Sequence, residues 1–469
     1  VGATSTPVQG QDGCPVGANT TQQASFSAAL GAFADTGKRV LFKHDDTFTG
    51  SSSATIAVNG PGTIGMYGVG ARPKVRSSAA NIITLGAAST VTMQDWRIVD
   101  LELDGQSSTG QHGVGVGGNA DQITLLRLNV HDIGDGILLS GSVVEYATAY
   151  DAYDGHMFDQ FTLADSTFNR FLGNYGLFLY ANRLAVLGNS INDAAAAQHT
   201  TRIPHAAKGA INNNTFSNPA LTKQTFTLRS VAYTAVGCPT GECLPNLLPY
   251  GTYAALTSQT VVSDNHFIAG LSNQPVTVGP SNPDQWDQRF QDILFERNWY
   301  TGAGANCCWP MLNMQAQDMT VRNELIDTTG AGFHLGIGVG GAGTVSPASS
   351  DVRLYHNTIF DNDATDDYGT PYGVSVNSGT IDITVINNLA YFPNLNGSFW
   401  RYNYATLASN NTSNTRTSPL MAVVPPLTPA DFKITTGSYA IGTGAVVPVW
   451  SDFFLVPPTS SRDMGAVIH

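Results

Sequence analysis

One short pattern returns along most of this chain. It has six positions: an apolar strand residue, two variable residues, a fourth residue that is usually asparagine, one more variable residue and a second apolar residue. The pattern occurs in VLGNSI, INNNTF, VSDNHF, FERNWY, TVRNEL, LYHNTI and VINNLA, with asparagines at 189, 214, 265, 298, 323, 357 and 388. The intervals between these asparagines are 25, 51, 33, 25, 34 and 31 residues, and the longest corresponds to two turns or to one turn with a long insertion.

A repeat of this length with short β-branched strands and Asn or Gly between them is typical of a β-solenoid. One coil cannot bury its own apolar face, but stacked coils share a continuous core. We expect the asparagines to adopt the left-handed conformation at sharp bends and to hydrogen-bond from coil to coil. The sequence therefore predicts an all-β fold, a right-handed parallel β-helix with a short N-terminal capping helix.

The two ends of the chain fit this prediction. Residues 20–37 place apolar side chains at helical spacing and stop at a glycine, and KRVLFK follows as a first strand. A long irregular insertion occupies about 230–258, where we expect a wall of the substrate groove. The prediction is one domain over 1–469, with a capping helix at about 20–37, coils over about 38–400 and a closing segment over about 401–469.

The composition limits where such a protein would work and what it would bind. The net charge of −13 argues against a nucleic acid or an anionic membrane as the partner, and it leaves room for an anionic polysaccharide held by a local basic patch. A chain that begins at Val1 and has no apolar run long enough to span a bilayer is what a processed secreted or periplasmic protein would look like. We expect that localisation, and a monomer.

Five cysteines are present. Cys238 and Cys243 close the short loop CPTGEC and are disulfide candidates in an oxidising compartment, whereas Cys14 stands alone and Cys307 adjoins Cys308. None has the paired spacing of a zinc site.

One segment differs from the rest in charge. No Asp or Glu occurs between Ala194 and Gly241, and the same segment carries Arg202, Lys208, Lys223, Arg229, His199 and His205. A local concentration of positive charge in an acidic protein attracts an anionic ligand. Lys208 and Arg229 are 21 residues apart, close to one coil, so we expect their side chains to project next to each other.

Residues 208–229, KGAINNNTFSNPALTKQTFTLR, resemble the alginate lyase and chondroitinase B family of β-helix polysaccharide lyases. That family carries a Lys, an Asn-rich N-x-F turn and an L-x-L-R strand with the same Lys-to-Arg interval. The resemblance implies a uronate polysaccharide as substrate, Lys208 as Brønsted base and Arg229 as its partner. It is close over about 30 residues and extends to the whole chain only as a fold.

The chain departs from this family just before the lysine. Two glutamates that bind calcium in the family are absent, and Thr201 and Ile203 or their neighbours occupy the positions. The prediction is therefore an enzyme without a metal cofactor, in which Arg202 or His205 neutralises the substrate carboxylate. A weaker resemblance links RIPHAAKG to the R-x-P-x-x-R-x-G segment of pectate lyases, whose aspartate clusters are not evident here.

The segment DFKITTGSYAIGTGA followed by RDMGAVIH resembles the closing segment of many bacterial β-helix proteins. The matching residues are Asp431, Phe432, Gly437, Ser438, Ala440, Ile441, Gly442, Asp463 and Gly465. This likeness concerns the fold and not an activity.

β-Elimination from a uronic acid needs a positive charge on the C6 carboxylate, a base for the C5 proton and an acid for the leaving O4. Neighbouring cations and the absence of carboxylates favour the unprotonated form of a lysine such as Lys208. His199, His205 and Tyr250 are candidates for the acid. The predicted catalytic residues are Lys208, Arg229, Arg202 and His205, and the predicted substrate-binding residues are His199, Lys223, Tyr233, Tyr250 and Tyr253.

Other functions fit parts of the sequence. A glycoside hydrolase or transglycosylase would use two carboxylates, and the candidate pairs are Asp132 with Asp135 and Asp151 with Asp154. A glycan-binding spike would need no catalytic residue. A mannuronate C5-epimerase would share the proton abstraction and return the proton.

Overall fold

A computed structural model describes sixteen stretches of the chain: residues 1–86, 92–116, 119–139, 158–194, 198–221, 223–229, 256–270, 275–280, 289–302, 310–330, 335–341, 348–363, 372–395, 400–401, 403–458 and 462–469. The chain forms two compact units, whose described parts lie in residues 1–206 and 207–469. No helix among the described residues is long and apolar enough to cross a bilayer.

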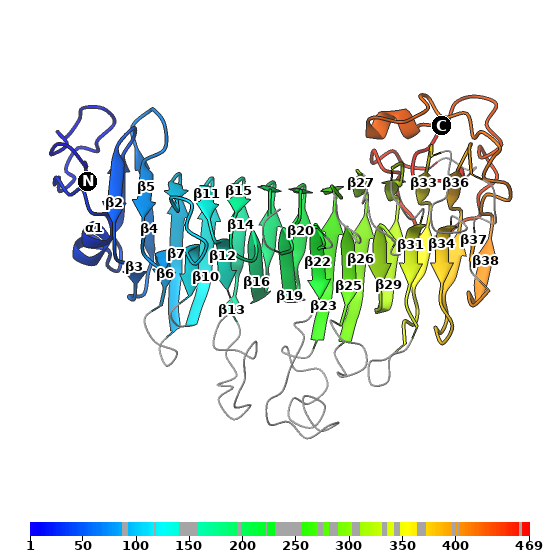
Figure 1. Ribbon diagram of the computed structural model, residues 1–469, viewed down its shortest axis with the longest axis horizontal. Coiled ribbons are helices and arrows are strands. Elements are labelled where there is room, and N and C mark those ends of the chain that lie inside the picture. Colours follow the sequence, from blue (N-terminus) through cyan, green and yellow to red (C-terminus); the bar gives the residue numbers. More distant parts are fainter. Residues whose placement is uncertain are drawn as a thin grey trace, which may run out of the picture. The chain divides into compact units, whose positions relative to one another are not determined.

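In the first unit, each coil adds strands to three parallel sheets (Figure 1). The first sheet contains β1 (Arg39–Lys43), β4 (Gly62–Tyr67), β7 (Thr92–Val99), β10 (Asn119–Leu126), β14 (Phe161–Ala164) and β17 (Ala185–Leu187). The second contains β3 (Ala54–Ile56), β6 (Asn81–Leu85), β9 (His112–Val116), β12 (Asp135–Leu139), β13 (Phe158–Asp159), β16 (Leu177–Asn182) and β19 (Thr201–Ala207). The third contains β2 (Thr47–Gly50), β5 (Lys74–Ser77), β8 (Glu102–Asp104), β11 (Asn129–Ile133), β15 (Thr167–Phe171) and β18 (Ser190–Asn192).

The second unit repeats this arrangement. Its first sheet contains β20 (Ala210–Asn212), β23 (Leu256–Ser263), β26 (Arg289–Glu296), β29 (Gln317–Arg322), β32 (Arg353–Tyr355), β35 (Thr384–Ile386) and β38 (Leu407–Ser409). Its second contains β22 (Phe226–Arg229), β25 (Val276–Gly279), β28 (Leu312–Met314), β31 (Leu335–Val339), β34 (Tyr372–Val376) and β37 (Trp400–Arg401). Its third contains β21 (Thr215–Ser217), β24 (His266–Ile268), β27 (Trp299–Thr301), β30 (Leu325–Asp327), β33 (Thr358–Phe360) and β36 (Leu389–Tyr391). The prediction of a right-handed parallel β-helix is confirmed.

The core of each unit is built by equivalent side chains stacked from coil to coil. In the third sheet of the first unit, one register joins Phe48, Val75, Leu103, Val130, Phe168 and Ile191, all of them buried. The corresponding register of the second unit joins Phe216, Phe267, Tyr300, Ile326, Ile359 and Ala390. Such stacks give every coil an apolar neighbour on both sides, which a single coil could not provide for itself.

The asparagines form a ladder, as predicted, but most of them do not make the bends. Asn265 Nδ2 donates to Asn298 Oδ1 at 2.9 Å, and Asn357 Nδ2 donates to Asn388 Oδ1 at 2.9 Å. The left-handed residue is the one immediately before the ladder residue, with φ of 54–66° at Gly188, Asn213, Asp264, Arg297, His356 and Asn387. The expectation that the repeated asparagine itself adopts the left-handed conformation is therefore wrong at those positions, because its side chain is needed inside the coil.

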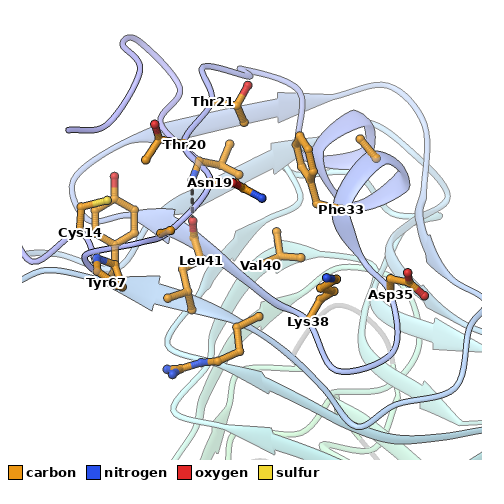
Figure 2. A pocket seen from close by; sticks show the side chains of 15 residues that line it. Cys14, Asn19, Thr20, Thr21, Phe33, Asp35, Lys38, Val40, Leu41 and Tyr67 are labelled. Carbon is orange, nitrogen blue, oxygen red and sulfur yellow. Dashed lines mark hydrogen bonds between the residues drawn. The ribbon is translucent and has the colours of Figure 1, made fainter. Parts of the chain in front are cut away.

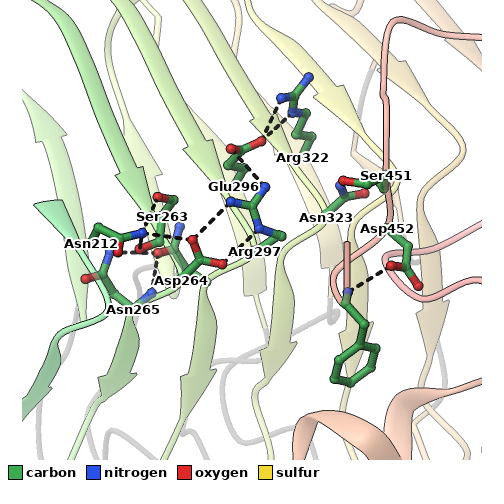
Figure 3. A network of polar contacts seen from close by, with 12 residues as sticks. Asn212, Ser263, Asp264, Asn265, Glu296, Arg297, Arg322, Asn323, Ser451 and Asp452 are labelled. Carbon is green, nitrogen blue, oxygen red and sulfur yellow. Dashed lines mark hydrogen bonds and ion pairs between the residues drawn. The ribbon is translucent and has the colours of Figure 1, made fainter. Parts of the chain in front are cut away.

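Asn323 is the exception among the seven asparagines. It adopts the left-handed conformation with φ of 57°, and Glu324 takes the ladder position. The sequence pattern placed the ladder one residue too early here, because an asparagine precedes the glutamate. Asn323 instead donates from Nδ2 to the carbonyl oxygen of Ser451, at 2.8 Å, in the closing segment (Figure 3).

Both ends of the chain cover apolar surface. The capping helix α1 (Phe26–Phe33) starts at Ser25, whose hydroxyl accepts the Ala28 N–H, and the Phe26 ring lies 4.8 Å from the ring of Phe42. This confirms a capping helix shorter than the predicted range of 20–37. In the closing segment, the short 3-10 helix η2 (Pro429–Phe432) leads into residues that pack over β30, β33 and β36. The buried side chains that the segment contributes are Met421, Phe432, Ile434, Ala440, Met464, Ala466 and Val467.

Several boundaries differ from the predicted ones. The coils continue to β38, past the expected limit near residue 400, because Asn411 adds one more ladder position and accepts from Asn388 Nδ2 at 3.0 Å. The predicted insertion of 230–258 ends earlier, since β23 starts at Leu256. Cys14 is a buried free thiol, and the other four cysteines lie outside the described residues. One domain over the whole chain stays a prediction.

Candidate functional site

Six polar side chains form a row along the edge of the second sheet of the first unit, where its strands begin. Asn81, His112 and Asp135 are the first residues of β6, β9 and β12. The next coils contribute residues just before or at the start of β16 and β19. We call this set the polar row: Asn81, His112, Asp135, Tyr175, His199 and Arg202.

The first half of the polar row holds a histidine between two oxygen acceptors. His112 Nδ1 lies 2.8 Å from Asn81 Oδ1, and His112 Nε2 lies 3.2 Å from Asp135 Oδ2. Asn81 donates from Nδ2 to Thr84 Oγ1, which orients its amide with the oxygen toward the ring. Each ring nitrogen of His112 thus faces a side-chain oxygen. His112 is therefore held between side chains of the two neighbouring coils, with part of its ring exposed.

Asp135 anchors this arrangement from below the surface. It is 3% exposed, and its Oδ1 accepts the backbone N–H groups of Asn174 at 2.8 Å and Tyr175 at 2.5 Å. Two backbone donors and the histidine thus satisfy both carboxylate oxygens at this depth. Asp135 thus connects His112 to the next member of the row.

The second half of the row centres on Tyr175. Its ring stacks on His199, with centroids 5.9 Å apart and planes 17° apart, and its hydroxyl accepts from Arg202 Nη1 at 3.5 Å. His199 is largely buried, whereas Tyr175 and Arg202 are half-buried. The structure thus brings together two predicted residues, His199 and Arg202, and adds a tyrosine hydroxyl between them.

His205 lies further along β19, in a different environment. It is 2% exposed, stacks on Tyr180 at 5.3 Å, and its Nε2 lies 3.0 Å from Asn182 Oδ1. Burial lowers the pKa of His205 to about 3, so the ring is neutral at pH 7. A neutral ring cannot offset a carboxylate charge, which leaves Arg202 as the predicted cation for that role.

Lys208 follows the last residue of β19 and belongs to the second unit. It is exposed and left-handed, with φ of 55°, and its backbone N–H donates to the Ser258 carbonyl oxygen at 3.0 Å. Left-handed residues recur at the same bend in other coils, for example Arg183, Gln259 and Asp292. Lys208 is therefore a bend residue as well as the predicted base.

Arg229 ends β22, the strand that begins the next coil, and its Nε donates to the Pro280 carbonyl oxygen at 3.4 Å. Lys208 is in register with Gln259 of the next coil, whereas Arg229 is in register with Gly279, so the two do not stand at equivalent positions. That their side chains project next to each other stays a prediction. Lys223 is half-buried in the turn before β22. Tyr233, Tyr250 and Tyr253 lie outside the described residues. The convergence of Arg202 and His205 with Lys208 and Arg229 stays a prediction.

The carboxylate pairs considered for hydrolysis are arranged differently. Asp132 belongs to β11 and pairs with His131 Nδ1 at 2.7 Å, whereas Asp135 belongs to β12 and pairs with His112. The two carboxylates thus serve separate hydrogen-bond networks. Asp151 and Asp154 lie outside the described residues.

Asp104, His131 and Asp132 are close enough to be tested as ligands of a metal ion. Their oxygens already have cationic partners, since Arg76 Nε lies 3.1 Å from Asp104 Oδ2 and Arg170 pairs with Asp132. His131 Nε2 faces Glu102 at 3.1 Å, and Lys74 pairs with the same glutamate at 2.7 Å. The cluster is a balanced ion-pair network, and these residues do not fit a metal.

Known proteins resemble this chain in structure but not in sequence. No family model and no curated protein matches the sequence. The mannuronan C-5 epimerase AlgE4 A-module of Azotobacter vinelandii is 14% identical, with 77% of this chain and 88% of that chain covered and a TM-score of 0.46. Pectate lyase Pel9A is 14% identical over 95% of this chain and 91% of its own, with a TM-score of 0.40. An alginate lyase from Paenibacillus sp. str. FPU-7 is 14% identical over 83% and 98%, with a TM-score of 0.31.

Sequence reasoning missed His112 and Tyr175, and it considered Asp135 only as a carboxylate for hydrolysis. The signal was present, because Asn81, His112, Asp135, Tyr175 and His199 are separated by 31, 23, 40 and 24 residues. These intervals follow the rhythm of the asparagine ladder. An alignment of the coils on their strand starts, instead of on the asparagines, would have revealed the row.

Proposed function

We propose that this protein is a secreted polysaccharide lyase that cleaves an acidic, uronate-containing polysaccharide, alginate or a similar polymer, by β-elimination. The observation that supports it most is the contact of Arg202 with Tyr175, beside His199, at the start of the segment that lacks acidic residues. A cation and a phenol hydroxyl held together on an accessible edge suit a sugar carboxylate and its neighbouring hydroxyl groups.

The polar row suits a chain-like ligand better than a compact one. Its members come from successive coils, which stack about 4.8 Å apart, so a polymer lying along the edge meets a new side chain at each coil. Arg202 would hold a carboxylate, and the ring of Tyr175 offers a surface for a sugar.

In the proposed reaction, Arg202 offsets the charge of the C6 carboxylate and Arg229 stabilises the enolate-like transition state. Lys208 in its unprotonated form removes the C5 proton. The C4–O4 bond then breaks, O4 takes a proton from an acid such as His199 or Tyr250, and a C4–C5 double bond remains. No metal is required in this scheme, because arginine supplies the positive charge.

The deciding experiment is ultraviolet absorbance over time with a panel of uronate polysaccharides, with and without a chelator. We expect absorbance to rise with one of them and the rate to survive chelation. Reducing ends without absorbance would show a hydrolase, and a changed sugar configuration without cleavage would show an epimerase. Binding without any chemical change would show a glycan-binding protein. Full loss of activity with chelator, restored by calcium, would contradict the metal-free mechanism.

A further inference from the structure

The first unit contains a cavity of about 400 Å³ beside its capping helix (Figure 2). Its walls come from the segment before α1, the end of α1 and the start of β1. None of its lining residues belongs to the polar row, so the cavity is a separate feature of the unit.

One wall of the cavity carries a hydroxyl group without a partner. Tyr67 is 6% exposed, and among the described residues its hydroxyl has no hydrogen-bond partner. A buried polar group of this kind destabilises the fold unless something satisfies it. Its neighbour in the cavity wall is Cys14, a thiol and a weak partner, so a ligand oxygen would satisfy the hydroxyl better.

The charges around the cavity favour an anion. Lys38 and Arg39 are exposed at its rim, and no carboxylate pairs with either among the described residues of the unit. Asp35 is the one acidic residue of the lining, and its Oδ1 already accepts the Thr36 N–H at 2.8 Å. Two cations thus face one partly occupied carboxylate, in a protein whose net charge is −13.

The remaining walls suit a sugar. Phe33 ends α1 with 42% of its surface exposed and offers a ring face, while Asn19, Thr20 and Thr21 offer an amide and two hydroxyls. A cavity of this volume is at the lower end of the range for small-molecule sites. We propose that this cavity, the N-terminal pocket, binds the end of a short carboxylated saccharide. The charge and the aromatic wall carry the proposal, and the choice of a saccharide rests on the proposed function.

Hydrogen exchange of the full chain, read by mass spectrometry, can test the N-terminal pocket locally. The probes are a tetramannuronate and, as the uncharged control, cellotetraose. The exchange experiment uses the Lys208→Asn variant, which lacks the proposed base and therefore does not cleave the uronate. We expect the uronate, but not cellotetraose, to slow exchange in peptides that cover residues 14–21 and 33–41.

A double substitution, Lys38→Gln with Arg39→Gln, should weaken this protection by about tenfold or more in uronate concentration, as expected for the loss of two charged contacts. Arg72→Gln is the matched control, since Arg72 is an exposed arginine of the same unit outside the pocket lining. No protection by the uronate, equal protection by cellotetraose, or unchanged protection in the double variant would each overturn the proposal.

The absorbance and exchange experiments distinguish failure of the N-terminal pocket from failure of the proposed enzyme. If absorbance shows elimination but residues 14–21 are not protected, the proposed lyase activity is supported and the proposed pocket is contradicted. If the uronate protects residues 14–21 but no polysaccharide of the panel undergoes elimination, the proposed pocket is supported and the proposed lyase activity is contradicted.

Discussion

Glu324 Oε1 accepts a hydrogen bond from Asn298 Nδ2 at 3.1 Å, so a buried carboxyl group fills a position that asparagine occupies in the neighbouring coils. Burial raises the pKa of Glu324 to about 8, and the side chain is therefore protonated at neutral pH. In this form it resembles the amide that it replaces.

The raised pKa of Glu324 predicts a loss of stability on the alkaline side. Between about pH 4.5 and 8 the folded chain holds one proton more at this site than the unfolded chain, so the free energy of unfolding falls as pH rises and levels off above pH 8. Glu324→Gln should remove this dependence and be more stable than the parent by a few kcal/mol near pH 9, at about 1.4 kcal/mol for each unit of pKa difference. Urea unfolding at about pH 4 and about pH 9 measures it. Asp382→Asn, at an exposed left-handed bend residue, is the control, and an equal gain there would contradict the assignment.

The ladder should be most sensitive at Asn298. This residue is fully buried, accepts from the backbone and side chain of Asn265, and donates to the Val262 carbonyl oxygen and to Glu324. Asn298→Ala leaves several buried groups without partners, each worth about 1–3 kcal/mol. We expect a loss of several kcal/mol in the free energy of unfolding, measured with urea.

A matched control is the half-buried Asn212 at the end of β20. Asn212 donates to Ser263 and Asp264 near the surface, where water can replace it (Figure 3). Asn212→Ala should cost under about 1 kcal/mol, because its partners stay solvated. Equal losses in the two variants would show that the ladder has no special role.

The assignment of Lys208 can be tested without disturbing its bend. Asparagine tolerates the left-handed conformation that Lys208 adopts, so Lys208→Asn removes the amine and keeps the backbone. Lys208→Asn and Arg229→Gln should each lower the rate on a uronate polymer by about a hundredfold or more, the usual effect of losing a general base or a charge-stabilising donor. Lys433→Ala, at an exposed lysine of the closing segment, should keep the parent rate. Turnover close to the parent in Lys208→Asn would rule out the proposed base.

Substitution of Arg202 should weaken substrate binding and leave the stability of the fold almost unchanged. Arg202→Gln keeps a donor toward the Tyr175 hydroxyl and removes the charge. We expect KM for a uronate polymer to rise about tenfold or more, with little change in the free energy of unfolding. An unchanged KM, or an equal rise for Arg183→Gln at a bend paired with Asp159, would contradict a specific role in carboxylate binding.

The closing segment should loosen in acid through His356. Burial lowers the pKa of His356 to about 4, and its Nε2 accepts from Asn387 Nδ2 at 2.9 Å, a bond that protonation would abolish. Asn387 also exchanges two hydrogen bonds with Ala445, each of 2.8 Å. The folded chain binds fewer protons here than the unfolded chain between about pH 6.5 and 4, so stability falls as pH falls through that window.

Hydrogen exchange in peptides of residues 421–469, followed from about pH 7 to about pH 4, would measure this loosening after correction for the intrinsic pH dependence of exchange. His356→Asn fits the left-handed bend and has no ring to protonate, so it should flatten the response. The same response in His356→Asn as in the parent would assign the effect to other groups.

The fold was largely predictable because the same chemistry recurs in every coil. The asparagine spacing, the capping helix and the closing segment all follow from residues that repeat or that cover an open end. The position of Glu324 was not predictable, because a neutral glutamic acid resembles asparagine only when its coil neighbours are known. The sequence analysis missed His112 and Tyr175 for a similar reason, since their partners come from coils 23 to 40 residues away.

The charge of the candidate site was easier to predict than its geometry. The lack of acidic residues around Lys208 is visible in the sequence, whereas the burial of His205 beside Asn182 and Tyr180 depends on how three strands are stacked. Local composition therefore predicts an anionic ligand, and tertiary packing makes His205 neutral.

The left-handed residue before each ladder position has a consequence for how such a protein can change. Its backbone conformation recurs, but its identity runs from glycine and asparagine through aspartate to arginine and histidine. One corner of every coil can therefore exchange charge while the core beneath it stays the same. Substitutions at this one surface position per coil can change the charge along the solenoid. A new ligand preference could arise there without a new fold.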